Sequence, residues 1–136
     1  MIKLFFDSDT MLDVSLERAP FYLPAINLME LCYQSHFKAI TSSIAFINTN
    51  YFLNKLAPTK RLQSLKRLRS VVSIINVDEQ IIDFALSSKF LDFEDAVQFY
   101  TAKSADADFI ITRNVKDYKQ SDIPVLTADD FLNTLS

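Results

Sequence analysis

Oxygen-bearing side chains gather at four places in the sequence, each beside a short apolar segment. Carboxylate and amide oxygens, unaccompanied by His or Cys, are the donors that Mg²⁺ and Mn²⁺ prefer in proteins. A cation held among them polarises a phosphoryl oxygen and lowers the pKa of a bound water, which then attacks phosphorus. Such chemistry needs no nucleophilic side chain. The candidates are Asp7 and Asp9; Asn48; Asp92, Glu94 and Asp95; and Asn114 and Asp117.

Each candidate also has a purely structural interpretation. Asp7 is suited to capping a helix that follows it, and Asp92 with Asp95 three residues later fits a helix cap and a first-turn carboxylate. Asn114 suits a turn with a left-handed backbone, since the chain has no glycine. The metal hypothesis depends on clustering, because carboxylates that approach one another repel unless a cation lies among them.

Predicted strands and helices alternate along the whole sequence. Short apolar or β-branched runs predict strands, and longer periodic segments bounded by prolines or capping residues predict helices. The alternation indicates an α/β fold, a three-layer α/β/α sandwich whose central parallel sheet has about five short strands, in one domain over 1–136. The predicted strands are 2–6, 38–41, 71–77, 109–112 and 125–126; the predicted helices are 8–14, 24–34, 43–56, one after Pro58, 79–87, 92–103 and one after Thr127.

This architecture predicts where a ligand binds. In open α/β sheets, ligands lie beyond the carboxyl ends of the strands, where the strand order reverses. If the first and fourth strands are neighbours, Asp7, Asp95 and the turn 114–117 meet at that edge.

Composition excludes several classes of function. The 136 residues include no glycine, so no Walker loop, dinucleotide fingerprint or nucleophile elbow is present. One cysteine cannot form an internal disulfide or a thiolate zinc site, and His36 is the only histidine for a Ser-His-Asp triad. No segment approaches the ~20 apolar residues of a membrane span. We therefore expect a cytoplasmic protein without a membrane partner.

Charge is segregated along the chain. The stretch 55–69 holds six basic residues and no acidic one, while the remainder holds 8 basic and 17 acidic residues. Such a stripe could bind a phosphate backbone, although leucines at a spacing of three equally predict an amphipathic helix with a solvated charged face. The candidate nucleic-acid-binding residues are Lys60, Arg61, Lys66, Arg67 and Arg69, together with Arg113.

Four segments resemble motifs of the PIN-domain family. The segment 4–13 (LFFDSDTMLD) is similar to the family's opening, 92–98 (DFEDAVQ) to its third motif and 109–118 (FIITRNVKDY) to its fourth, and 123–127 with a terminal helix also matches. Their order and spacing agree over nearly the whole chain. The resemblance implies a PIN fold and a Mg²⁺- or Mn²⁺-dependent endoribonuclease that acts on RNA, as in VapC-like toxins of toxin–antitoxin pairs.

The resemblance also assigns roles to single residues. Asp7 matches the first acid of the family's metal-binding quartet and Asp95 the third. Asn48 stands where the second acid, usually Glu, is expected, and Asn114 stands at the fourth, with Asp117 close behind. Each asparagine removes a negative charge, so we expect weak metal affinity. The carboxylates that could compensate are Asp9, Asp92 and Asp117. An antitoxin protein and a second copy of the chain are the implied partners.

Two other functions stay open at this point. The two asparagines fit a PIN-fold module that binds RNA or a partner protein with weak or no catalysis. Alternatively, the run 7–10 (DSDT) is similar to the haloacid-dehalogenase signature Asp-x-Asp-x-Thr, which would make Asp7 the covalent nucleophile of a phosphatase. The Thr arrives one residue early for that signature.

Overall fold

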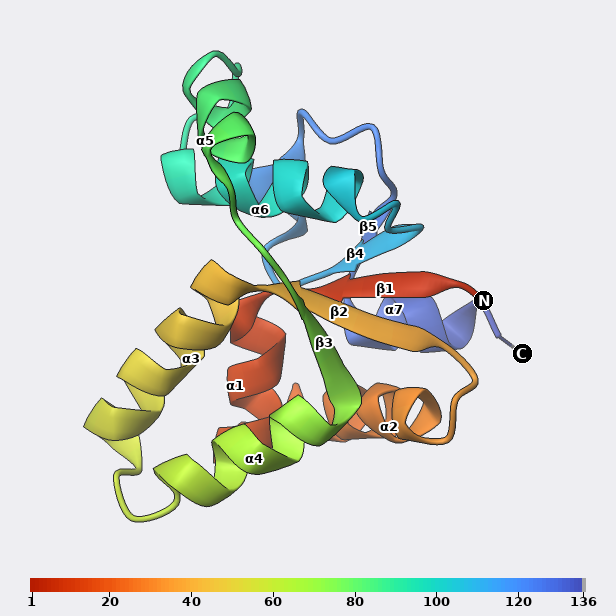
Figure 1. Cartoon of the computed structure of the whole chain (residues 1–136). Helices are drawn as coiled ribbons and strands as arrows, with labels where there is room; N and C mark the ends of the chain where they lie inside the picture. The colour runs from red at the N-terminus through yellow and green to blue at the C-terminus, as the bar shows by residue number, and fades with distance from the viewer. Residues whose placement is uncertain (136) are drawn as a thin grey trace.

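A five-stranded parallel sheet lies at the centre of the computed structural model, which describes residues 1–135 (Figure 1). The strand order is β3-β2-β1-β4-β5. Because β2 and β4 flank β1, the strand order reverses at β1, and the predicted neighbourhood of the first and fourth strands is confirmed. The strands are β1 (Lys3–Phe6), β2 (Lys38–Ser42), β3 (Val72–Ile75), β4 (Phe109–Ile111) and β5 (Val125–Leu126).

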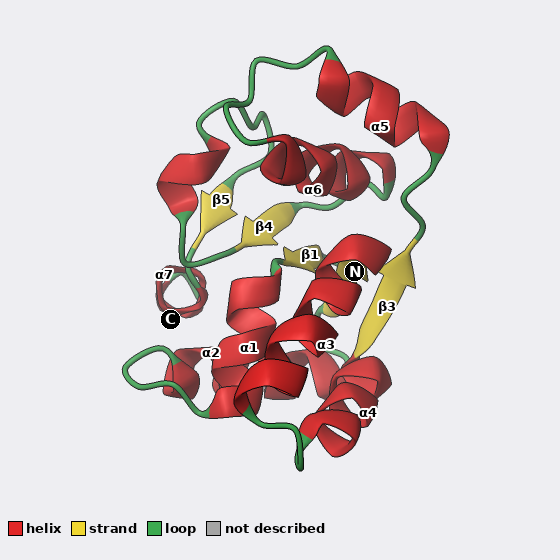
Figure 2. Ribbon diagram, turned by 90° about the vertical axis from the view of Figure 1, so that its left-hand side faces the viewer, coloured by secondary structure: helices red, strands yellow, loops and turns green. Residues whose placement is uncertain are grey.

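Helices cover both faces of this sheet, which confirms the predicted three-layer fold. In Figures 1 and 2, α1, α2, α3, α4 and α7 lie on one side of the sheet, and α5 and α6 lie on the other. Two helices connect each of the successive pairs β1–β2, β2–β3 and β3–β4. The helices are α1 (Ser8–Leu16), α2 (Tyr22–Tyr33), α3 (Ser43–Leu56), α4 (Arg61–Val71), α5 (Glu79–Leu86), α6 (Phe93–Ser104) and α7 (Ala128–Asn133), and a 3-10 helix, η1 (Val115–Tyr118), follows β4.

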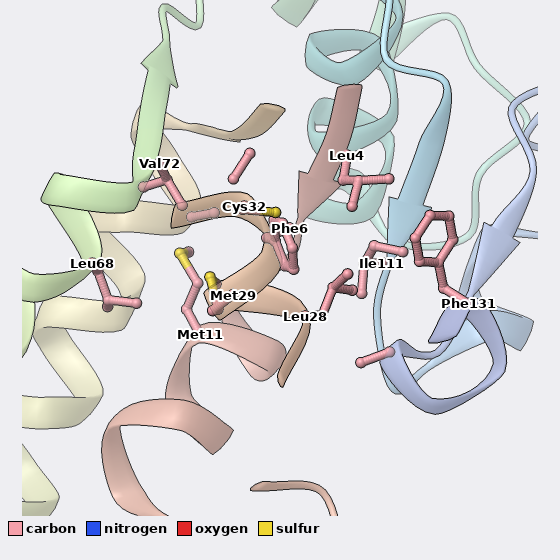
Figure 3. Close-up of a cluster of buried hydrophobic side chains, with 13 residues drawn as sticks. Leu4, Phe6, Met11, Leu28, Met29, Cys32, Leu68, Val72, Ile111 and Phe131 are labelled. Carbon is pink, nitrogen blue, oxygen red and sulfur yellow. The ribbon is translucent and has the colours of Figure 1, made fainter. Parts of the chain in front are cut away.

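Alternation along β1 distributes its side chains between the two faces. Leu4 and Phe6 point into the larger core, where they pack with residues of α1, α2, α4 and α7 (Figure 3), whereas Phe5 packs on the other face against α6. All three side chains are fully buried. Burying such a side chain contributes roughly 1.5–3 kcal/mol. The central strand is therefore held from both faces up to the residue that precedes Asp7.

The chain makes its left-handed turns without glycine. Positive φ angles occur at Glu17 (52°), Ser35 (66°) and Asp106 (57°), each at or just beyond the end of a helix. The prediction of a left-handed backbone at Asn114 is wrong: its φ and ψ are −101° and 59°. Its N–H bonds to the hydroxyl of Thr112, and η1 begins at the next residue, so the turn closes without a positive φ.

No helix within residues 1–135 combines the length and the apolar character that crossing a bilayer requires.

Candidate functional site

Asp7 lies at the carboxyl end of the central strand, where it caps α1. One of its oxygens accepts a hydrogen bond from the N–H of Ser8 (2.7 Å) and the other accepts one from the hydroxyl of Tyr118 (2.7 Å). Its own N–H donates to the carbonyl of Ile111 in β4 (3.1 Å). The oxygen bonded to Tyr118 also accepts a long hydrogen bond from the hydroxyl of Thr112 (3.5 Å). The carboxylate is therefore fixed in direction by α1 and by the segment after β4, and the oxygen bonded to Ser8 keeps a lone pair for a further ligand.

Asp9 joins the start of α1 to the segment after β4. A single oxygen of Asp9 accepts from the hydroxyl of Thr112 (3.0 Å), the N–H of Arg113 (3.2 Å) and the amide nitrogen of Asn114 (2.9 Å). Three donors on one oxygen leave little capacity there for a cation. Asp9 thus positions the turn that follows β4, and the prediction that it compensates as a ligand receives no support from these contacts.

Asp95 approaches the same place from the other layer. It lies in the first turn of α6, where its N–H donates to the capping carboxylate of Asp92 (2.9 Å). Within residues 1–135 no donor makes a hydrogen bond to the Asp95 carboxylate. Burial raises its pKa from 3.8 to about 7, and repulsion from Asp92, Asp7, Asp117 and Glu94 adds to that rise. A carboxylate surrounded by carboxylates is a group that a cation would stabilise.

The pKa of Asp7 is raised by the same two causes, burial and nearby carboxylates. Burial raises its pKa from 3.8 to about 6, with a further rise from Asp9 and a smaller one from Glu94, against the lowering effect of the hydrogen bonds from Tyr118 and Ser8. Burial and the nearby carboxylates also raise the pKa of Tyr118 well above its usual value. Its hydroxyl therefore stays protonated and continues to donate to Asp7 at neutral pH.

Asn48 is held between two helices. From α3, its amide nitrogen donates to the carboxylate of Glu94 in α6, and the capping residue Ser42 of α3 donates to Gln98 of α6. Glu94 thus places a carboxylate beside the position where Asn48 lacks one. Glu94 is one of the oxygen-bearing candidates in the sequence, but the family resemblance assigns it no role, and its contact with Asn48 is visible only in the structure.

Asn114 and Asp117 lie on the opposite border, on the segment that follows β4. Both side chains are exposed, and the Asn114 N–H₂ group points to Asp9, which leaves its oxygen without a hydrogen-bond donor in residues 1–135. Asp117 is close enough to raise the pKa of Asp95. The sequence-predicted site residues Asp7, Asp95, Asn114, Asp117 and Asn48 therefore all border one region at the carboxyl ends of β1 and β4.

A divalent cation fits this donor set through two carboxylates rather than a preformed cage. Within residues 1–135 no three His, Cys, Asp or Glu side chains converge in the manner of a complete metal site. Mg²⁺, however, usually binds through one or two carboxylates and keeps waters and substrate phosphates as its other ligands. Asp7 and Asp95 can supply that pair: burial is the main cause of their raised pKa values, and a cation would relieve the repulsion from other carboxylates that adds to the rise.

The predicted nucleic-acid-binding residues either lie away from the acidic site or already interact with other residues. α3 has 14 residues, about 21 Å at the usual rise, and it separates the site from the start of α4, which carries the basic stripe (Figure 1). On α4, Arg61 donates to Asn50 and Arg69 donates to the carbonyl of Val72. Arg113 pairs with Asp13 (3.0 Å) and lies over the ring of Phe21 (4.2 Å). Each of these three guanidinium groups therefore interacts with a partner outside the acidic site.

Comparison with known proteins agrees with this fold. The PIN domain family matches residues 3–116. A chain of the crystal structure of VapBC2 from Rickettsia felis bound to a DNA fragment from their promoter is similar over 93% of this chain and 98% of that one, with a TM-score of 0.73 and 15% identity. The toxin–antitoxin complex from Klebsiella pneumoniae gives a TM-score of 0.70 and 23% identity over 92% of this chain and 97% of that one.

A third similar structure is VapC20 of Mycobacterium tuberculosis, described as a Sarcin-Ricin loop cleaving toxin. Its TM-score is 0.63 at 16% identity, over 79% of this chain and 86% of that one. No curated protein matches the sequence at a significant level. At such identities the structural likeness establishes the fold.

Proposed function

The chain belongs to the PIN domain family, and from that premise we propose that it is a metal-dependent endoribonuclease that hydrolyses RNA phosphodiesters. The observation that carries the proposal is the approach of Asp7 and Asp95 at the point where the strand order reverses, each with its pKa raised by burial and by other carboxylates. Segments nearly ninety residues apart bring them together. Helix capping alone does not require that the two carboxylates meet.

Asp7 and Asp95 would be the principal ligands of a Mg²⁺ or Mn²⁺ ion, with Asn114 and Asp117 as further oxygen donors. Such an ion supplies Lewis acidity toward a phosphoryl oxygen and acidifies a bound water. Tyr118 orients Asp7 through its hydrogen bond, and Asp9 holds Asn114 in place. These residues keep the ligands in a fixed geometry, which reduces the reorganisation that metal binding requires.

The two asparagines are compatible with a nuclease, and they lower the metal affinity that we expect of it. Asn48 donates to Glu94, so the charge that Asn48 lacks is supplied from α6 beside it. Asn114 offers a neutral carbonyl-type oxygen, which hard cations accept at lower affinity than a carboxylate. We therefore expect a weak metal site and slow turnover.

We further propose that the protein acts in the cytoplasm as the toxin of a toxin–antitoxin pair, neutralised by an antitoxin protein and able to form a homodimer. Support comes from the similar chains of toxin–antitoxin complexes. Large apolar side chains also remain exposed on α3, at Ile47 (62%), Tyr51 (56%) and Leu56 (61%). Exposed apolar residues grouped on one element are typical of a surface that contacts another protein.

Cleavage assays on single-stranded and structured RNA test the enzyme. We expect Mn²⁺-dependent cleavage that EDTA abolishes and that Asp7→Asn and Asp95→Asn reduce by roughly a hundredfold, as for loss of a principal electrostatic group. Asp83→Asn is the matched control, since Asp83 is exposed on α5, outside the site. Cleavage that survives both Asp7→Asn and EDTA contradicts the proposal.

A PIN-fold module that binds RNA or a protein without useful catalysis is the second candidate. The two asparagines and the lack of a three-carboxylate cage in residues 1–135 favour it. Titration calorimetry that detects no Mn²⁺ binding at millimolar concentration, together with intact RNA binding, selects this function over the nuclease. The phosphatase alternative has no further support, because Thr10, on which its signature depended, is buried and donates to Asp9.

A further inference from the structure

A groove next to Asp95 is lined by three lysines that lie outside the basic stripe of the sequence. The loop between α5 and α6 forms one wall, and η1 with the residues after it forms the other. The groove has a volume of about 240 Å³. Its charged lining residues are Lys89, Lys116 and Lys119 together with Asp92, Asp95 and Asp117.

The three lysines are available to a ligand. Each is exposed, and none makes an ion pair or a side-chain hydrogen bond within residues 1–135. Other basic side chains of this protein do find partners: Lys103 pairs with Asp122 (2.7 Å), and Arg18 pairs with Asp13 (2.9 Å). Three unpaired ammonium groups around one groove favour an anionic ligand with several charges along it.

The groove is held rigidly relative to Asp7. Phe90, the neighbour of Lys89, packs its ring against Phe99 (5.3 Å between centroids) and against Tyr118 (6.3 Å). Tyr118 in turn donates to Asp7. One wall of the groove contacts Tyr118 through Phe90, and the other wall contains Tyr118 at the end of η1. Because Tyr118 orients Asp7, a ligand in the groove has a defined position relative to the proposed cation.

The volume and the charged lining of the groove indicate which kind of ligand it can hold. Pockets for whole small molecules usually span roughly 300–1,000 Å³, so about 240 Å³ suits one segment of a longer molecule. The three lysines balance the three aspartates of the groove, and a divalent ion between Asp7 and Asp95 would offset the charge of those two carboxylates. A phosphodiester chain crossing the cation can then place its next phosphate among the lysines.

We propose that the groove lined by Lys89, Lys116 and Lys119 binds the RNA backbone immediately beside the phosphate that is cleaved. RNA as the ligand rests on the proposed function. The basic stripe on α4 is then a secondary surface, since α3 separates it from the acidic site.

RNA binding, measured apart from cleavage, tests this proposal. Fluorescence anisotropy of a labelled single-stranded RNA is recorded from 50 to 200 mM salt with Ca²⁺ in place of Mn²⁺, and a denaturing gel checks that the RNA stays intact. The triple variant Lys89→Gln, Lys116→Gln, Lys119→Gln is compared with a charge-matched variant on the other basic surface, Lys55→Gln, Lys60→Gln, Lys66→Gln. Circular dichroism confirms that both variants fold.

We expect the groove variant to bind roughly tenfold or more weakly and to lower the slope of log affinity against log salt by about 2, since three phosphate contacts contribute about 0.7 each on single strands. The charge-matched variant should change both quantities less. Equal or larger losses in the charge-matched variant, an unchanged groove variant, or a wild-type chain that binds no RNA overturn the proposal.

The same experiment separates this inference from the nuclease proposal. Groove-dependent RNA binding without any Mn²⁺-dependent cleavage supports the groove and contradicts the enzyme. Cleavage that persists while the groove variant keeps its full affinity supports the enzyme and overturns the groove.

Discussion

Two acidic regions lie on either side of Asp9, one buried at Asp13 and one half-buried at Asp7 and Asp95, and they differ in their charged partners. Asp13 in α1 is 1% exposed and is flanked by the guanidinium groups of Arg18 (2.9 Å) and Arg113 (3.0 Å). The charged groups that shift the pKa values of Asp7 and Asp95 are other carboxylates, and within residues 1–135 neither acid forms an ion pair. One acidic region is therefore paired with arginines and the other is not, although both belong to the same helix-and-strand framework.

This difference distinguishes Asp13, a carboxylate paired within the fold, from Asp7 and Asp95, the carboxylates proposed to bind a cation. Burial raises the pKa of Asp13, but its two arginines oppose that rise, so the carboxylate is held as part of an ion-pair network. At Asp7 and Asp95 the principal neighbours add to the rise. This contrast supports the proposal that a cation binds at the second place, where it would relieve the repulsion among the carboxylates.

Removing the counter-charged carboxylate gives the largest expected effect on stability. Asp13→Ala leaves Arg18 and Arg113 without their common partner, and we expect a loss of about 3 kcal/mol, near the lower end for breaking a buried ion pair because both arginines are partly exposed. Urea denaturation measures it. A loss below 1 kcal/mol would show that the two regions do not differ as described. Asp83→Asn, an exposed acid on α5, should change the stability little.

Mn²⁺ binding at Asp7 and Asp95 should depend steeply on pH. Because a cation competes with protons on carboxylates whose pKa values are about 6 and about 7, the Mn²⁺ affinity should rise more than tenfold between about pH 5 and pH 8. Titration calorimetry at several pH values measures this change. An affinity that stays flat across that range would place the ion elsewhere.

Neutralising Asp95 should stabilise the metal-free protein at high pH. The folded pKa of about 7 lies above the ordinary 3.8, so the contribution of this group to stability is present below about pH 4 and is lost as the pH rises through 7. Asp95→Asn should therefore raise the unfolding free energy by roughly 1 kcal/mol at pH 8, after allowance for solvent screening, and change it little at pH 4.

Thermal unfolding at both pH values measures the Asp95 effect, with Asp83→Asn as the control. If Asp95→Asn destabilises the protein equally at both pH values, the carboxylate is a structural group like Asp13.

The smallest effect is expected at Tyr118. Its hydrogen bond lowers the pKa of Asp7, so Tyr118→Phe should raise that pKa and move the pH midpoint of Mn²⁺ binding upward. The expected change is below one pH unit, because burial remains the main cause. Calorimetry across pH detects the shift, and Tyr33→Phe on the exposed face of α2 controls for loss of a hydroxyl. An unchanged midpoint would mean that Tyr118 only packs.

The fold was largely predictable because its signals are local. The apolar run ending at Asp7, the β-branched strand after α4 and the caps at Asp7, Ser42, Asp92 and Thr127 each act within a few residues. The sequence did not predict the 3-10 helix η1 or the backbone of Asn114. Their conformation depends on Thr112 and Asp9, and the contact with Asp9 crosses about a hundred residues of sequence.

The sequence by itself determined the kinds of atoms available and the order of the elements that carry them: oxygen donors without His or Cys, no glycine, and alternating strands and helices. Only the tertiary structure decided which carboxylates meet an arginine and which meet one another. It also brought Glu94 to Asn48 and grouped three lysines around one groove. Charge pairing depends on distances between side chains from remote segments, and those distances are set by how helices pack on a sheet rather than by spacing along the chain.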